Sequence, residues 1–127
     1  MKQVYALIAA VMMLVPIPVM ADFAVMGIGT ETCSQLGNDL SNPAKNGVAV
    51  ELILMSWVQG YLSAANVDAL HERHEYRDMA AMSIDEQKRK LLAYCSEHPL
   101  APIADAAANL YYSLPLKPFT SPNASHR

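Results

Sequence analysis

The longest regular pattern of apolar positions in this chain of 127 residues lies between Val48 and Asn66. Apolar residues recur there at intervals of three and four, the spacing that lines them up along a helix, and polar residues are few. The apolar positions are Val50, Ile53, Leu54, Trp57, Val58, Tyr61, Leu62 and Ala65. Because they extend around almost the whole circumference, the pattern predicts a buried central helix.

Small residues occupy the second half of this helix, at Gly60, Ala64 and Ala65. Small side chains allow another helix to approach closely, and they leave a groove where no helix fills the space. Close packing of a second helix is the preferred interpretation, and a groove is the alternative.

Shorter amphipathic patterns predict further helices on both sides of the central one. The first begins after Thr30 or Thr32, either of which can cap it, and ends before Pro43. Another begins after Ser83, where the sequence Ser-Ile-Asp-Glu forms a capping box, and it ends near Glu97. Residues 67–82 in front of it are rich in charge and are expected to form a solvated connection.

A last helix is predicted near Pro102, because proline is tolerated in the first turn of a helix. The inward stripes of the three shorter helices are Cys33, Leu36 and Leu40, then Ile84, Leu91, Leu92 and Cys95, then Ile103, Ala106, Ala107, Leu110 and Leu114. Both cysteines therefore face the core. These patterns predict an all-α fold, a small four-helix orthogonal domain with one disulfide between helices.

The two ends of the chain differ from the helical part. Residues 1–21 have a charged start at Lys2, an apolar stretch and small residues near Ala21, which are the features of a cleaved secretory signal peptide. Prolines interrupt the apolar stretch, which is shorter than the roughly 20 residues of a membrane span. We therefore expect a periplasmic protein that is free of the membrane after cleavage. The domain is predicted to cover residues 22–115, with an extended arm at 22–29, and residues 116–127 are expected to be a disordered tail.

The chain contains two cysteines, Cys33 and Cys95. Cysteine pairs persist as disulfides in oxidising compartments, and small domains with thin cores depend on them most. We therefore expect a structural disulfide between the two. Redox-active or metal-binding thiols are the alternative, but the chain has no Cys-Xaa-Xaa-Cys motif and His98 is a lone candidate ligand near Cys95.

Charge and motif content narrow the function to binding. The formal net charge is −3, and the basic cluster at residues 88–90 has acidic neighbours, so nucleic acid is not an expected partner. His71 and His74 stand three positions apart, whereas the zinc-protease helix needs four, so no metal site is predicted. The sequence has no nucleophile elbow and no glycine-rich phosphate loop. We therefore expect neither enzymatic activity nor a cofactor.

Three stretches resemble the HdeA/HdeB-like family of small periplasmic proteins: Thr32-Cys33, Trp57 to Ser63, and Tyr94 to Leu114 with its His-Pro turn and alanine-rich helix. The resemblance implies a helical domain in which one disulfide, here between Cys33 and Cys95, joins two helices. It also implies an acid-activated chaperone, a homodimer at neutral pH, that holds unfolded clients on an apolar helix face exposed at low pH. The residues expected to meet the client are Leu54, Trp57, Tyr61 and Leu62.

The stretch from Gly60 to Ser63 and the His-Pro turn are also similar to the Tai-type immunity proteins of type VI secretion, small exported helical inhibitors of amidase toxins. This resemblance implies an alternative function, inhibition of a toxin through the charged segment from Asp68 to Asp78, because rim charges set specificity and association rate. An adaptor of an envelope assembly is a third alternative. A chaperone should tolerate charge changes in that segment, and a dedicated inhibitor should not.

Overall fold

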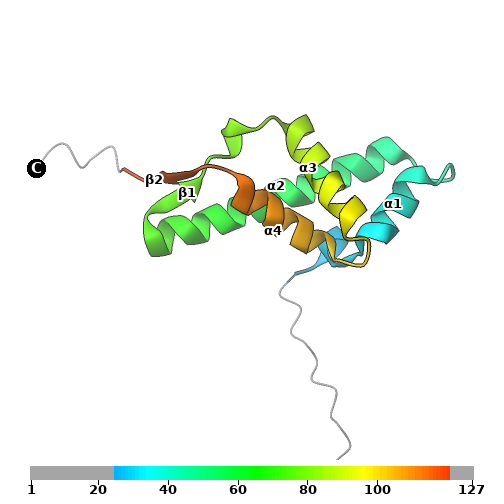
Figure 1. Ribbon diagram of the computed structural model, residues 1–127, viewed down its shortest axis with the longest axis horizontal. Coiled ribbons are helices and arrows are strands. Elements are labelled where there is room, and N and C mark those ends of the chain that lie inside the picture. Colours follow the sequence, from blue (N-terminus) through cyan, green and yellow to red (C-terminus); the bar gives the residue numbers. More distant parts are fainter. Residues whose placement is uncertain (1–24, 121–127) are drawn as a thin grey trace, which may run out of the picture.

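The computed structural model of the chain describes residues 25–120, and most of this part is helical (Figure 1). The helices are α1 (Cys33–Ser41), α2 (Gly47–Arg73), α3 (Ile84–Glu97) and α4 (Ile103–Ser113), with 3-10 turns at Gly27–Thr30 and Met79–Ala81. Two short strands, β1 (Glu75–Arg77) and β2 (Leu116–Pro118), complete the described part. The prediction of a mainly helical fold is confirmed. The expected signal peptide and the end of the expected tail lie outside the described residues.

The helices begin at the caps that the sequence predicts. Thr32 precedes α1, and its hydroxyl accepts a hydrogen bond from the Gln35 amide while the Gln35 side chain accepts one from the Thr32 amide at 2.7 Å. Ser83 caps α3 by accepting from the Glu86 amide. Pro102 stands directly before the first residue of α4. Capping satisfies amides that have no partner within the helix, so Thr32 and Ser83 fix where α1 and α3 start. Both bonds of a capping box are present at Thr32 and one of them at Ser83, whereas Pro102 makes no side-chain cap bond.

The central helix, α2, is longer than predicted. It starts after Asn46, whose side chain accepts a hydrogen bond from the Ala49 amide, and it ends at His74, which has a left-handed φ of 54°. The first part of the expected solvated connection therefore continues the helix up to Arg73. Among the described residues, α2 is the helix that is long and apolar enough to cross a membrane. The mean hydropathy of its most apolar stretch is 1.4, and 22% of that stretch is buried in the domain.

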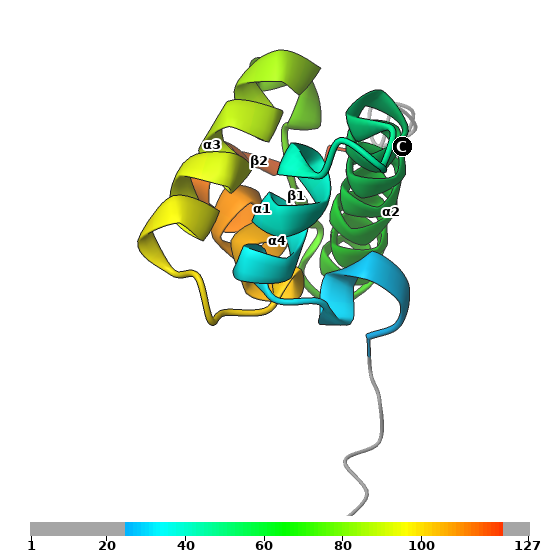
Figure 2. The same cartoon turned by 90° about the vertical axis from the view of Figure 1, so that its right-hand side faces the viewer.

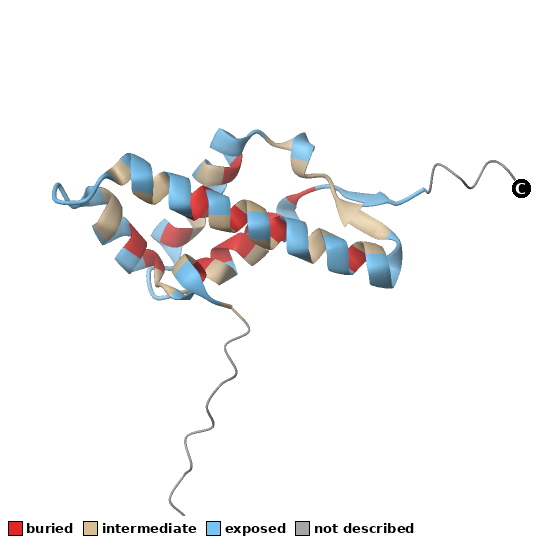
Figure 3. Ribbon diagram, turned by 180° about the vertical axis from the view of Figure 1, so that it is seen from behind, coloured by how far each residue is buried: buried red, intermediate tan, exposed pale blue. Residues whose placement is uncertain are grey.

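The core lies on one side of α2. Figure 2 looks nearly along this helix and shows α1, α3 and α4 together on that side. Leu54, Val58 and Leu62 are 0% exposed and are spaced by one turn, so they form a line along the helix. They pack in one cluster with residues of the other three helices, namely Leu36, Leu91, Ile103, Ala107 and Leu110, and with Leu114 directly after α4. Figure 3 shows the alternation of buried and exposed residues along α2 that results.

Two positions predicted to face the core are exposed, Ile53 at 58% and Ile84 at 50%. For Ile53 the reason is that α2 is apolar all round, so periodicity alone does not select the side that the other helices cover. Ile84 is the first residue of α3 and lies beside Leu52 and Met55 in a shallow surface hollow. These two inward assignments are therefore wrong.

The predicted disulfide is present. Cys33 at the start of α1 and Cys95 near the end of α3 are bonded, with their Cα atoms 4.9 Å apart, and both are buried. The Cys33 amide also donates to the carbonyl of Ala101 at 2.9 Å, and the Ile103 amide donates to the carbonyl of Glu31 at 2.9 Å. The disulfide and these backbone bonds join α1 to the α3–α4 connection, and we call this region the disulfide end.

The two short strands were not predicted. They pair antiparallel, with Tyr76 opposite Lys117, and the Phe119 amide extends the pairing by donating to the carbonyl of His74 at 2.8 Å. The chain therefore keeps a defined structure beyond residue 115, which differs from the expectation of a disordered tail from residue 116. The strands are three residues long and far apart in sequence, and neither shows a two-residue apolar period.

Candidate functional site

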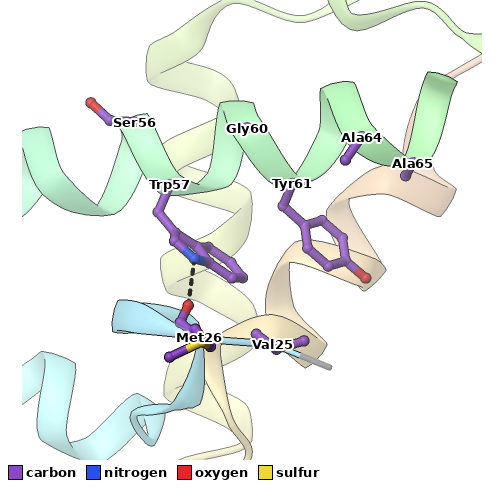
Figure 4. Close-up of a pocket in the computed structure, with 8 residues that line it drawn as sticks. All are labelled: Val25, Met26, Ser56, Trp57, Gly60, Tyr61, Ala64 and Ala65. Carbon is purple, nitrogen blue, oxygen red and sulfur yellow. Dashed lines mark hydrogen bonds between the residues drawn. The ribbon is translucent and has the colours of Figure 1, made fainter. Parts of the chain in front are cut away.

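A groove runs along α2 beside the N-terminal segment of the described part (Figure 4). Its volume is about 540 Å³. Pockets that hold small ligands have volumes of about 300–1,000 Å³, so this groove has room for a large apolar side chain. Its lining is formed by Val25, Met26, Ser56, Trp57, Gly60, Tyr61, Ala64 and Ala65.

The floor of the groove is formed by small residues. Gly60 and Ala64 are one helical turn apart and both are exposed. A Cβ atom placed on Gly60 would meet no other atom within 4 Å. The preferred interpretation, close packing of another helix on Gly60, is therefore wrong, and the alternative of a groove holds. The other helices pack instead against the side of α2 that carries Leu54 and Leu62.

Trp57 forms a fixed wall at one end of the groove. Its indole nitrogen donates a hydrogen bond to the carbonyl of Met26 at 2.9 Å, and its ring stacks on Tyr61 with the centroids 5.5 Å apart. Gly29 packs against the same ring, because a Cβ atom there would lie 2.0 Å from an indole carbon. Only glycine fits this close approach. The ring is therefore held from both sides and presents a pre-organised apolar surface.

Tyr61 lies next to Trp57 and turns its hydroxyl toward α4. Burial raises the pKa of Tyr61, and the nearby Tyr112 and Asp105 raise it further. The raised pKa favours the neutral phenol.

The groove belongs to a longer apolar strip without charge. The helical period places Ile53 one turn before Trp57 and Val67 one turn after Ala64, and Ile53 and Val67 are more than half exposed. No charged residue occurs between Glu51 and Asp68. We call this strip the open face of α2, and it consists of Ile53, Trp57, Gly60, Ala64 and Val67.

The four residues expected to meet a client divide into two pairs. Trp57 and Tyr61 are half-buried and line the groove, whereas Leu54 and Leu62 are 0% exposed in the core. Val25 and Met26 line the groove as well and were not predicted to belong to the site. The signal for them was the apolar character of the residues that follow the expected cleavage site.

The charged segment that the alternative function needs uses many of its charges internally. Arg73 donates to the carboxylate of Glu75 at 3.0 Å, which raises the pKa of Arg73. Arg77 donates to the carbonyls of Tyr112 and Leu114, at 3.0 and 2.9 Å, near the end of α4. Such paired groups make weaker contacts to a partner, because the existing bonds must first be broken.

Polar contacts also hold the two strands to α2, and we call this region the strand end. The side chain of Asn66 donates to the carbonyl of Arg77 and accepts from its amide, both at 2.8 Å, and it also accepts from the Tyr111 hydroxyl at 3.2 Å. Lys117 on β2 donates to the carboxylate of Asp78. This hydrogen bond lowers the pKa of Asp78 and raises the pKa of Lys117.

A second hollow of about 340 Å³ lies at the strand end, where His71 and His74 meet Val67, Leu70 and Phe119. Both histidines are exposed. Within residues 25–120, no group of three or more His, Cys, Asp or Glu side chains is arranged to hold a metal ion. The lining of this hollow is otherwise apolar.

Comparison with protein-family models, with curated proteins and with solved structures finds no match for this chain. A function for the groove is therefore inferred from the residues that form it.

Proposed function

We propose that the protein is exported to the periplasm and acts without catalysis, by holding apolar segments of client proteins on the open face of α2. The observation that carries this proposal is the groove of about 540 Å³ with two half-buried aromatic side chains in its lining. Aromatic side chains in a partly desolvated hollow supply much of the binding energy at protein interfaces. The occupant is expected to be apolar, because the floor of the groove carries no charge.

Acid is proposed to enlarge this binding surface. Leu54 and Leu62 meet a client only after the core loosens, since both are fully buried. Carboxylates whose pKa is lowered in the folded protein lose their stabilising contacts as the pH falls through that lowered value, and Asp78 is such a group. The Cys33–Cys95 disulfide keeps α1 and α3 joined during the change. An acidified domain would then add its inner apolar stripe to the groove.

The experiment measures suppression of aggregation with the purified exported protein and malate dehydrogenase as the client. The client is unfolded by heat at neutral pH, and in a second assay by acid at about pH 2–3. Suppression at neutral pH is expected to be weak and to increase strongly in acid, in parallel with the binding of an anilinonaphthalene sulfonate dye. Absence of suppression at both pH values would refute the proposal.

A pair of matched variants locates the activity. Gly60→Leu fills the groove, and Gly37→Leu places the same side chain on α1, where a Cβ atom likewise meets nothing within 4 Å. Both changes replace a helical glycine by a good helix former, so the fold is expected to be retained. We expect Gly60→Leu to reduce suppression at neutral pH and Gly37→Leu to leave it unchanged. Equal suppression by the two variants would exclude the groove as the binding site.

The inhibitor alternative gives the opposite result in the charged segment. Asp68 and Glu72 are exposed, so their replacement by lysine changes surface charge without disturbing the core. Suppression of aggregation is expected to survive Asp68→Lys and Glu72→Lys. Loss of client binding in these variants, with normal binding by Gly60→Leu, would contradict a groove-based function and favour recognition through charge.

A further inference from the structure

The Cys33–Cys95 disulfide lies beside a surface hollow between α1 and α3. The hollow has a volume of about 270 Å³. Both cysteines are part of its lining, although only 3% of Cys33 and 7% of Cys95 are exposed. The hollow is therefore a path from solvent toward the disulfide of the folded domain. Its other lining residues are Leu36, Gly37, Leu92, Ser96 and Pro99.

A glycine keeps this path open. Gly37 is exposed on α1, one turn after Cys33, and a Cβ atom placed on it would meet no other atom within 4 Å. Helix side chains lean toward the N-terminus and cover the preceding turn. A larger side chain at residue 37 would therefore extend over the hollow and over Cys33.

The size and the lining of the hollow limit what can enter it. Its volume is below the range of about 300–1,000 Å³ that is usual for pockets that hold drug-sized ligands. Apart from the two cysteines, no ionisable side chain lines it. The hollow therefore suits a small thiol that carries no other charged group.

The two sulfur atoms differ as leaving groups. In thiol–disulfide exchange a thiolate attacks one sulfur, and the other sulfur leaves as a thiolate. Cys33 is the first residue of α1, where the positive end of the helix dipole stabilises negative charge. Cys95 lies in the last turn of α3, at the negative end of that helix. Cys33 is therefore the better leaving group, and Cys95, the more exposed of the two, is the sulfur that is attacked.

We propose that this hollow is a thiol-exchange site, in which a small thiol attacks the Sγ of Cys95 while the domain is folded. The incoming thiol first loses its proton to solvent. Its sulfur then bonds to Cys95, and the electron pair of the broken S–S bond stays on the Sγ of Cys33. A second thiol attacks this mixed disulfide and frees Cys95, so the two cysteines are reduced and the added thiols are oxidised to their own disulfide.

This site is independent of the proposed function of the groove, which lies on α2. Exchange through the hollow removes the covalent link between α1 and α3 without prior unfolding of the domain. The disulfide is then both a structural cross-link and a bond that a thiol can open in the folded protein.

The test follows the reduction of the purified, oxidised protein by dithiothreitol, with alkylation by iodoacetamide and mass spectrometry as the readout. Direct attack on the folded protein gives a rate that is proportional to the dithiothreitol concentration and changes little with urea below the unfolding transition. Reduction that requires unfolding gives a rate that reaches a plateau with dithiothreitol or rises steeply with urea. We expect the first behaviour, and the second would overturn the proposal.

Two matched variants separate a blocked hollow from a more stable fold. Gly37→Leu and Gly60→Leu both replace a helical glycine by a better helix former, so both slow a reduction that depends on unfolding. Only residue 37 lines the hollow, because residue 60 lies in the groove on α2. We expect reduction to be several-fold slower than in the wild type for Gly37→Leu and unchanged for Gly60→Leu. Equal rates in the two variants would overturn the proposal.

Mercaptoethanol identifies the sulfur that is attacked. A short exposure is stopped with iodoacetamide and acid, and mass spectrometry of peptides locates the adducts. We expect mercaptoethanol on Cys95 and the carbamidomethyl group on Cys33. The reverse arrangement, or equal amounts of both, would overturn the assigned direction of attack. Circular dichroism before reduction confirms that each protein is folded.

Discussion

The two ends of the domain are held together by different physical means. At the disulfide end, α1 and α3 are joined by the Cys33–Cys95 bond inside the apolar core. At the strand end, the side chain of Asn66 attaches β1 to α2. Backbone hydrogen bonds join β2 to β1, and Lys117 pairs with Asp78, the residue after β1. Proteins open first where few apolar contacts are buried. The strand end is therefore expected to open first when the pH falls or a residue there is substituted. The disulfide end is expected to stay folded under the same conditions.

Removal of the disulfide should have the largest effect. The Cys33→Ser, Cys95→Ser double variant loses a cross-link between positions 62 residues apart. The chain-entropy estimate for a loop of this size is about 4 kcal/mol. We expect the free energy of unfolding, measured by urea titration, to decrease by about this amount, which is comparable to the whole stability of a small domain. Equal urea midpoints for variant and wild type would contradict a dominant role for the disulfide end.

Asn66→Ala should weaken the strand end selectively. It removes the side chain that bonds both backbone groups of Arg77 and the hydroxyl of Tyr111. Loss of a partner to partly buried polar groups costs about 1–3 kcal/mol.

Hydrogen exchange separates the two ends in this variant. The amide of Phe119, bonded to His74, should exchange faster, and the amide of Cys33, bonded to Ala101, should keep its protection. Equal acceleration at both amides would show that the two ends open together.

Alanine substitution should change the stability of the domain in opposite directions at two glycines, Gly37 and Gly27. Gly37→Ala on α1 adds a Cβ atom into open space and should stabilise the domain by up to about 1 kcal/mol. Gly27 has a φ of 74°, and alanine in this left-handed conformation costs about 1–2 kcal/mol. The midpoint of thermal unfolding should therefore rise for Gly37→Ala and fall for Gly27→Ala. Shifts of the same sign would contradict the backbone conformations described above.

The titration of Asp78 alone should produce the smallest effect, and it should appear at the strand end. The pKa of Asp78 is lower in the folded protein than in the unfolded chain, so its pair with Lys117 stabilises the fold above the unfolded value of about 3.9. This contribution is lost as the pH falls through the lowered folded value. Amide NMR shifts of residues near Asp78 should therefore change in that range, before those near Cys33. Asp78→Asn should remove the local pH response, and an unchanged response would assign it to other groups.

Local signals in the sequence were sufficient for the helix starts and for the disulfide. Thr32 and Ser83 act through neighbours within a few residues, so their effect is independent of tertiary structure. The start of α4 also uses a distant partner, because the Ile103 amide donates to the carbonyl of Glu31. The two cysteines lie on inward stripes of amphipathic helices, which made their pairing predictable.

Local sequence patterns did not predict the features that depend on residues distant in the chain. The end of α2 requires a left-handed His74, a conformation more common for glycine or asparagine. The β1–β2 pair joins residues from both sides of α3 and α4. The choice between Leu54 and Ile53 as core residues is made by the other helices, because α2 itself is apolar on both sides. The groove lies on the side of α2 that the other helices leave uncovered.

The disulfide also divides the chain into a closed ring and a free strap. The ring runs from Cys33 to Cys95 and contains all of α2, whereas α4 and β2 belong to the strap that follows it. A single proteolytic cut within the ring leaves both fragments in one molecule until a reductant is added. A cut in the connection 98–102 breaks the covalent link to the strap, which then stays on the ring only through non-covalent contacts such as the packing of α4 in the core.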